Sequence, residues 1–156
     1  MAGTPDDTRP ESWHRYFAIE ANNQAWALAE LPSRTPAQVR EMLNAAHTAA
    51  LHWDAVGSEL HHMRGLTLLA QAHALAGNGR FALQLVDTFA PFFSARDTDD
   101  WETAFVHTID AFAAAVAGEA ARYRTAYAAA AAAVEAIADE EDRAIVMRTF
   151  EQVPTP

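Results

Sequence analysis

The stretch LLAQAHALAG at residues 68–77 is echoed by IDAFAAAVAG at residues 109–118. Both stretches carry apolar and small side chains at helical spacing, and both end in a glycine that leads into a turn and a second helix. The two glycines, Gly77 and Gly118, are 41 residues apart (118 − 77), which is within the range of stacked helix pairs. A single pair cannot bury its apolar face alone, so the repeat predicts a stack in which neighbouring pairs cover one another.

Helix-start and helix-stop signals recur on both sides of this repeat. Thr8 with Glu11 and Thr35 with Gln38 have the spacing of a capping box. Ser58 is the predicted cap of a third helix, and acidic residues precede two later helices. Stop signals lie at residues 31, 57, 77, 91, 118 and 154. Together the signals predict helices at 8–31, 35–57 and 58–77, and a fourth helix from 79 that Pro91 ends or kinks. A fifth helix is predicted at 99–118, a sixth directly after it, and a seventh from about 139 to the stop at 154.

No segment shows the two-residue alternation of a β-strand. The predicted fold is therefore all-α, with about seven helices stacked as antiparallel pairs in one domain at residues 8–153, after a flexible N-terminal segment at residues 1–7. The third helix has apolar residues on two faces and should lie between neighbours. The helix with the alanine run 128–133 is expected to be covered on two sides as well, or else to be an alanine-rich helix on the outside.

Composition excludes several classes of function. The 156 residues carry a formal net charge of −10 without a local cluster of Lys or Arg, so binding to nucleic acid or to an anionic membrane surface is not expected. The absence of cysteine excludes disulfides, thiolate zinc sites and cysteine nucleophiles. The N-terminus lacks the pattern of a signal peptide, and no apolar stretch is long enough to span a bilayer. We expect a cytoplasmic protein.

Residues 58–138 resemble the tetratricopeptide (TPR) repeat, in which a first helix ends in a glycine-containing turn before an alanine-bearing second helix. The closest match is the turn GNGRFA at residues 77–82. The 41-residue offset exceeds the usual 34, and the early tryptophan of the motif is absent. The stretches 42–57 and 137–143 are similar to a group of small bacterial TPR-like proteins without an assigned activity, a likeness that concerns fold and not chemistry.

The resemblance implies a groove lined by the first helix of each pair. Mapped from Gly77, it places Arg64, Thr67 and Gln71 toward the groove, with Thr108 at the matching position of the next pair. Arg64 is the charged group there that suits a carboxylate of a partner. Solvated surface is the alternative interpretation of these four positions.

Seven histidines in a chain without cysteine raise the question of a metal site. His47 and His52 point away from each other on one helix, and His62 and His73 share a face but lie roughly 16 Å apart along it. The best local pair is His107 with Asp110, three residues apart, which needs two further ligands from another helix.

No catalytic constellation is evident. Ser58, His61 and Asp54 can be drawn as a triad, but no strained nucleophile turn supports it and Ser58 already serves as a helix cap. Trp53 and Trp101 lie on apolar stripes and should pack in the core. Trp26 and the pair Phe92 and Phe93 are less constrained and can form a contact surface for self-association.

These observations predict a non-enzymatic interaction module without a cofactor. It binds a protein or peptide partner, or a second copy of itself as a homodimer. The alternative is a helical bundle that binds a small molecule or a metal ion through histidines from several helices.

Overall fold

The computed structural model describes residues 3–156, and all regular structure in that range is helical. Met1 and Ala2, the start of the predicted flexible segment, lie outside the described residues. The seven helices are α1 (Pro10–Ala29), α2 (Pro36–Val56), α3 (Glu59–Leu75), α4 (Gly79–Ser94), α5 (Asp100–Ala117), α6 (Ala120–Ala136) and α7 (Glu140–Phe150). The prediction of an all-α fold with seven helices is confirmed.

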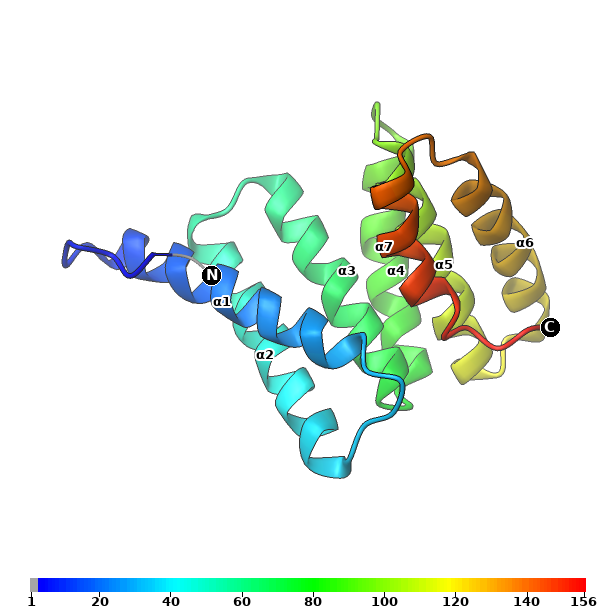
Figure 1. Cartoon of the computed structure of the whole chain (residues 1–156), viewed down its shortest axis with the longest axis horizontal. Coiled ribbons are helices and arrows are strands. Elements are labelled where there is room, and N and C mark those ends of the chain that lie inside the picture. Colours follow the sequence, from blue (N-terminus) through cyan, green and yellow to red (C-terminus); the bar gives the residue numbers. More distant parts are fainter. Residues whose placement is uncertain (1–2) are drawn as a thin grey trace.

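Consecutive helices run in opposite directions and pack on one another (Figure 1). Contacts also join α1 to α3, α3 to α5 and α5 to α7. Two reversals separate the members of each of these further pairs, so α1, α3, α5 and α7 point roughly the same way. They form one layer of the stack, while α2, α4 and α6 cover it from outside.

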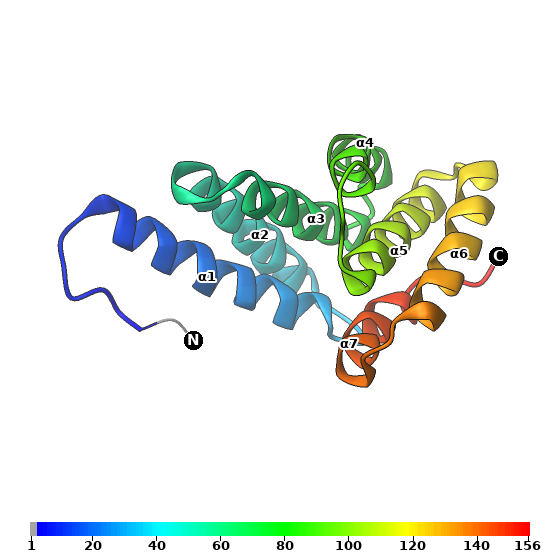
Figure 2. The ribbon, with the colours of Figure 1, turned by 90° about the horizontal axis from the view of Figure 1, so that it is seen from above.

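The last helix returns to the first one. The Nη2 atom of Arg34, in the loop after α1, donates to the side-chain oxygen of Gln152 at 2.9 Å, and Nε2 of Gln152 donates to the carbonyl of Ala29 at 3.0 Å. A wider ion pair joins Arg148 to Glu30 at 3.6 Å. Figure 2 shows α7 beside the end of α1. These contacts bring both ends of the inner layer together around a hollow.

Two groups of buried side chains hold the helices. We call the first the N-terminal core: Ala18, Ala21, Ala25, Ala29, Met42, Ala45, Ala46, Ala49, Trp53, Leu68, Leu69 and Ala72. The second, the C-terminal core, includes Ala70 and Ala74 of α3, and its large side chains on α4 and α5 are Leu83, Val86, Phe89, Phe93, Phe105, Val106, Ile109 and Phe112. Helix α3 contributes to both cores, which confirms that it lies between neighbours.

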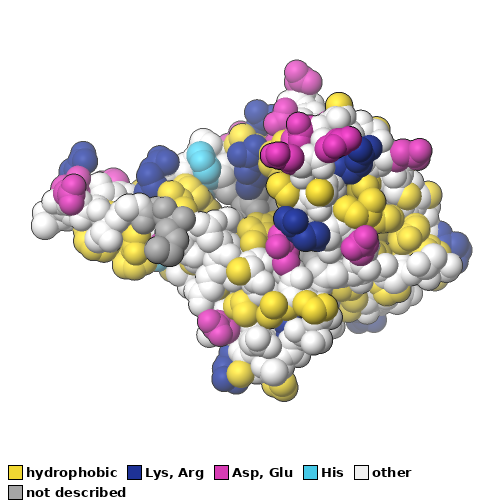
Figure 3. Space-filling view, in the orientation of Figure 1, with side chains coloured by type: hydrophobic (Ala, Val, Ile, Leu, Met, Phe, Trp, Pro, Cys, Tyr) yellow, Lys and Arg dark blue, Asp and Glu magenta, His cyan; other side chains and the backbone are white. Residues whose placement is uncertain are grey.

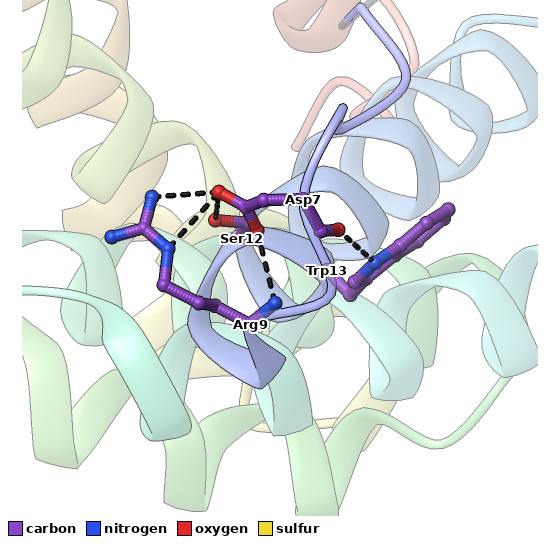
Figure 4. A network of polar contacts seen from close by, with 4 residues as sticks. All are labelled: Asp7, Arg9, Ser12 and Trp13. Carbon is purple, nitrogen blue, oxygen red and sulfur yellow. Dashed lines mark hydrogen bonds and ion pairs between the residues drawn. The ribbon is translucent and has the colours of Figure 1, made fainter.

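The start of α1 differs from the prediction. Thr8 does not cap the helix, because the N-cap is Arg9 and its side chain makes no capping bond. Asp7 instead organises the first turn: its carboxylate accepts from the backbone N–H of Arg9 at 3.0 Å and from the hydroxyl of Ser12 at 3.2 Å, and its carbonyl accepts from the indole N–H of Trp13 at 3.0 Å (Figure 4). The capping box of Thr35 and Gln38 forms as predicted.

Two other local predictions left alternatives open. Helix α4 continues through Pro91 to Ser94, so the proline does not end the helix. Helix α6 buries only the stripe Ala126, Ala130 and Val134, so the alanine run is covered on one side, in agreement with the alternative of an alanine-rich outer helix. The glycines at the two repeat turns behave as expected: Gly77 and Gly118 have φ angles of 83° and 77°, which side chains with a Cβ rarely adopt.

No helix in residues 3–156 combines the length and the apolar character needed to cross a membrane.

Candidate functional site

The inner layer of helices surrounds a pocket of about 270 Å³. Its walls come from the first helix of every pair and from α7, with one residue from α4. They are Asn22 and Trp26 of α1, Glu30 directly after α1, Arg64 and Thr67 of α3, Phe93 of α4, Trp101, Glu102, Phe105 and Val106 of α5, and Ile145 of α7. The face drawn in Figure 3 is hollowed where α1 and α3 meet α7, with hydrophobic and charged side chains around the hollow.

Aromatic rings form much of the pocket wall. The rings of Trp26 and Phe105 lie 5.5 Å apart, and Trp101 meets Phe105 edge-on at 6.1 Å. Phe105 is buried, whereas Trp26 and Trp101 are partly exposed. Ile145 is 42% exposed at the pocket. The surface offered to a ligand is therefore rigid and mostly apolar.

Arg64 is the cation of this pocket. Its Nε donates to Glu102 at 2.6 Å, and its guanidinium lies over the ring of Trp101, 5.4 Å from the centroid. Glu102 is buried, and a buried carboxylate is tolerated when a cation pairs with it. The two Nη nitrogens of Arg64 have no hydrogen-bond partner within residues 3–156. These donors can therefore bind an acceptor on a ligand without breaking the pair with Glu102.

The four groove residues predicted from the repeat divide into two groups. Arg64 and Thr67 line the pocket, although the hydroxyl of Thr67 already donates to the carbonyl of Met63 at 2.9 Å. Gln71 and Thr108 were expected to face the groove, yet both are fully buried. Because no surface of either residue is exposed, neither can touch a partner in this conformation.

Gln71 and Thr108 nevertheless share an unusual feature. The amide nitrogen and oxygen of Gln71 and the hydroxyl of Thr108 are buried without a hydrogen-bond partner in the described chain. Gln71 follows Arg64 by two helical turns, and Thr108 follows Trp101 by the same interval on the parallel helix α5. Because Arg64 and Trp101 are in contact, the two buried polar residues lie at a similar depth beneath the pocket.

Most of the pocket wall is not evident from the sequence. Trp101 packs on the core, as its apolar stripe predicts, and it also lines the pocket. Trp26, a predicted contact residue, lines the pocket as well. Phe93 is buried, and Phe92 packs under the guanidinium of Arg96 at 4.6 Å. These two phenylalanines therefore do not form an exposed aromatic patch.

The alternative metal pair, His107 with Asp110, gains no third ligand among the described residues. The carboxylate of Asp110 accepts from Nε of Arg122 at 2.6 Å, and Arg122 also pairs with Asp87 at 2.8 Å. Burial raises the pKa of Asp110 despite the opposing effect of Arg122. Within the described residues, no three side chains of His, Cys, Asp or Glu converge in a way that could hold a metal ion.

The structure does pair histidines across helices. His14 of α1 and His52 of α2 bring their Nδ1 atoms to 2.8 Å, and His47 of α2 and His73 of α3 bring their Nε2 atoms to 3.1 Å. Burial and then the neighbouring histidine lower the pKa of both His52 and His73. The spacing of histidines within one helix does not reveal these pairs, because the members of each pair lie on different helices.

Ser58 and His61 meet as part of a helix cap. The hydroxyl of Ser58 and Nδ1 of His61 are 2.8 Å apart, and the same Nδ1 accepts from the backbone N–H of Ser58 at 3.2 Å. The ring of His61 is stacked on Trp53 at 4.6 Å. No carboxylate in residues 3–156 is hydrogen-bonded to His61, so the contact lacks the third member of a triad.

Comparisons of the chain with models of protein families, with curated proteins and with solved structures find no match.

Proposed function

We propose that this chain is a non-enzymatic interaction module, a short TPR-like stack that binds an apolar side chain of a protein or peptide partner. The observation that carries the proposal is the pocket itself, walled by the first helix of every pair and lined by partly exposed Trp26 and Trp101. A groove on this layer is what the resemblance to TPR repeats implies. A cytoplasmic location belongs to the same proposal.

The size of the pocket favours a side chain over a cofactor. Pockets for drug-sized ligands and cofactors occupy about 300–1,000 Å³, and this one encloses about 270 Å³. A single large aliphatic or aromatic side chain matches such a volume and can pack against Trp101 and Phe105. The rest of a peptide would then run across the rim, where Ile145 is exposed.

The charge at the pocket suggests where the peptide is fixed. The Nη donors of Arg64 point to an acceptor on the partner, either a carboxylate or a backbone carbonyl. Glu102 offsets the charge of Arg64, and the chain carries −10 overall. We therefore expect a peptide ligand with one apolar anchor residue and one polar contact at Arg64, and not a strongly acidic segment.

A test can begin with phage-displayed random peptides panned on the full chain. The expected result is enrichment of peptides that share a large apolar residue and bind at least tenfold more weakly to Trp101→Ala. Arg64→Ala should weaken the same peptides by a smaller factor. Leu51→Ala is the matched control, because Leu51 is 66% exposed on α2 and does not line the pocket.

A second variant guards against loss of folding. Ile145 is exposed at the pocket, so Ile145→Asp places a charge at the entrance without removing a core side chain. It should block peptide binding while leaving the circular dichroism spectrum and the thermal melting temperature nearly unchanged. Equal binding by the parent chain, Trp101→Ala and Ile145→Asp would refute the proposed site.

A further inference from the structure

A second polar feature lies away from the pocket, at the junction of α2, α3 and α4. His47 and His73 are 26 residues apart in the sequence, yet their Nε2 atoms are separated by 3.1 Å. The ring of His73 is held in place by Phe81 of α4, whose ring centroid lies 4.6 Å away. Nδ1 of His73 faces the side-chain amide of Asn78 at 3.2 Å. His73 is thus oriented from two sides, with the tip of its ring directed at His47.

The spacing of the two nitrogens matches the bite of a metal chelate. Bonds from imidazole nitrogen to zinc are about 2.0–2.1 Å long, so two such bonds at angles between about 90° and 109° place the nitrogens roughly 2.9–3.4 Å apart. The observed 3.1 Å lies inside this interval. Both contacts are made by Nε2, the nitrogen at the free end of the ring, where an ion meets little steric hindrance.

We infer that His47 and His73 form a bidentate site for a divalent transition-metal ion such as Zn²⁺, Ni²⁺ or Cu²⁺. Imidazole is a preferred ligand of these three ions. His47 is exposed, so the ion has access from solvent. Because no three metal-binding side chains converge in the described part of the chain, the remaining coordination positions are open to water or to a donor from another molecule.

Asn78 supplies the outer contact that such a site needs. As drawn, its amide N–H₂ faces Nδ1 of His73, an arrangement that lets Nε2–H of His73 donate to His47. Rotation of the Asn78 amide by 180° presents its oxygen instead, so that Nδ1–H of His73 donates to it and the Nε2 lone pair becomes free for metal. Metal-binding histidines commonly donate their other N–H to an oxygen in this way.

The other cross-helix pair provides an internal comparison. His14 and His52 meet through Nδ1 at 2.8 Å, which corresponds to a bite angle below about 90° for bonds of zinc length. The Nδ1 atom is also next to the carbon that carries the side chain, which crowds an incoming ion. We therefore assign this pair to a hydrogen bond alone.

Calorimetric titration of the full, tag-free chain with Zn²⁺ at pH 7.5 tests the inference. One Zn²⁺ per chain is expected, with at least tenfold weaker binding in His47→Ala and in His73→Ala and unchanged binding in His52→Ala. Asn78→Asp should bind several-fold more tightly, since a carboxylate is the stronger acceptor for Nδ1–H. A simple histidine–histidine hydrogen bond would show none of these differences.

Thermal melts complete the test. Metal that binds the folded chain raises its melting temperature, so Zn²⁺ should stabilise the parent chain and His52→Ala but not His47→Ala. Melts without metal show whether each variant folds. Absence of saturable binding below millimolar Zn²⁺ overturns the inference, as does binding that survives in both His47→Ala and His73→Ala or is lost in His52→Ala. Pocket variants such as Ile145→Asp should not alter Zn²⁺ binding, so this result is independent of peptide binding.

Discussion

The N-terminal and C-terminal cores differ in their large side chains. Among the described residues, eight of the twelve members of the N-terminal core are alanines and none is a phenylalanine. The C-terminal core also holds eight alanines among its twenty members, but it adds four phenylalanines. The first core depends on the absence of bulk and the second on its presence.

The pocket lies at the boundary between these cores. Trp26, Leu75 and Leu85 pack against both cores, and Trp26 also lines the pocket. The pocket therefore lies where a core rich in alanine meets a core that also holds aromatic rings. The comparison therefore makes opposite predictions for the two cores: truncation should damage one, and enlargement the other.

Removing bulk from the C-terminal core should have the largest effect on stability. Phe89 is fully buried, and Phe89→Ala is expected to lower the free energy of unfolding by about 3–5 kcal/mol through lost burial and the cavity left behind. Phe81→Ala on the same helix is the control, because Phe81 is 41% exposed. Urea denaturation measures both. Similar losses in the two variants would contradict the assignment of Phe89 to the core.

Adding bulk to the N-terminal core should have the next largest effect. Ala25 is fully buried in the N-terminal core, so Ala25→Leu is expected to cost about 1–3 kcal/mol because neighbouring side chains must shift. Ala27 is exposed two residues further along α1, and Ala27→Leu should change stability by less than about 0.5 kcal/mol. If the two leucine variants were equally stable, close packing of α1 on α2 would not be the basis of this core.

Removing orphaned polar atoms beneath the pocket should raise stability. The hydroxyl of Thr108 is buried without a partner, and such a group costs about 1–3 kcal/mol. Thr108→Val keeps the shape of the side chain, so we expect a gain of about 1 kcal/mol in urea denaturation. Thr67→Val is the matched control, because the Thr67 hydroxyl has an acceptor in Met63 and its removal should bring no gain. A loss of stability in Thr108→Val would show that its hydroxyl is satisfied in solution.

Local signals explain why the helices could be predicted from the sequence. The capping box of Thr35, the positive φ of Gly118 and the carboxylate of Asp139 act within a few residues of where they stand. Asp7 shows the limit of such rules. It lies one residue before the predicted capping box of Thr8 and Glu11, yet its carboxylate, and not Thr8, makes the hydrogen bonds at the start of α1.

The pocket could be predicted only in part. Repeat register directs Arg64 and Thr67 to one helix face, and both line the pocket. Register alone does not show that Gln71 is fully buried or that Trp101 stays partly exposed, because burial depends on how neighbouring helices pack. The cross-helix histidine pairs were missed for a related reason: they need the relative position of two helices, which one helical pattern does not contain.

The smallest expected effect is on the pH dependence of stability, which should depend on the histidines of α1–α3. Six of the seven histidines fall within α1–α3, and only His107 lies in α5. Burial and the neighbouring His14 lower the pKa of His52 in the folded chain, so the unfolded chain takes up protons first as the pH falls. The stability of the chain should therefore decrease as the pH drops below about 6.5, the ordinary value for histidine, and level off once the folded chain is protonated as well. Urea denaturation at pH 7.5 and pH 5.5 should show a smaller loss of stability for His52→Gln than for the parent chain. An unchanged loss in His52→Gln would mean that the His14–His52 contact does not make α1 and α2 sensitive to acid, and the two cores would then differ in packing alone.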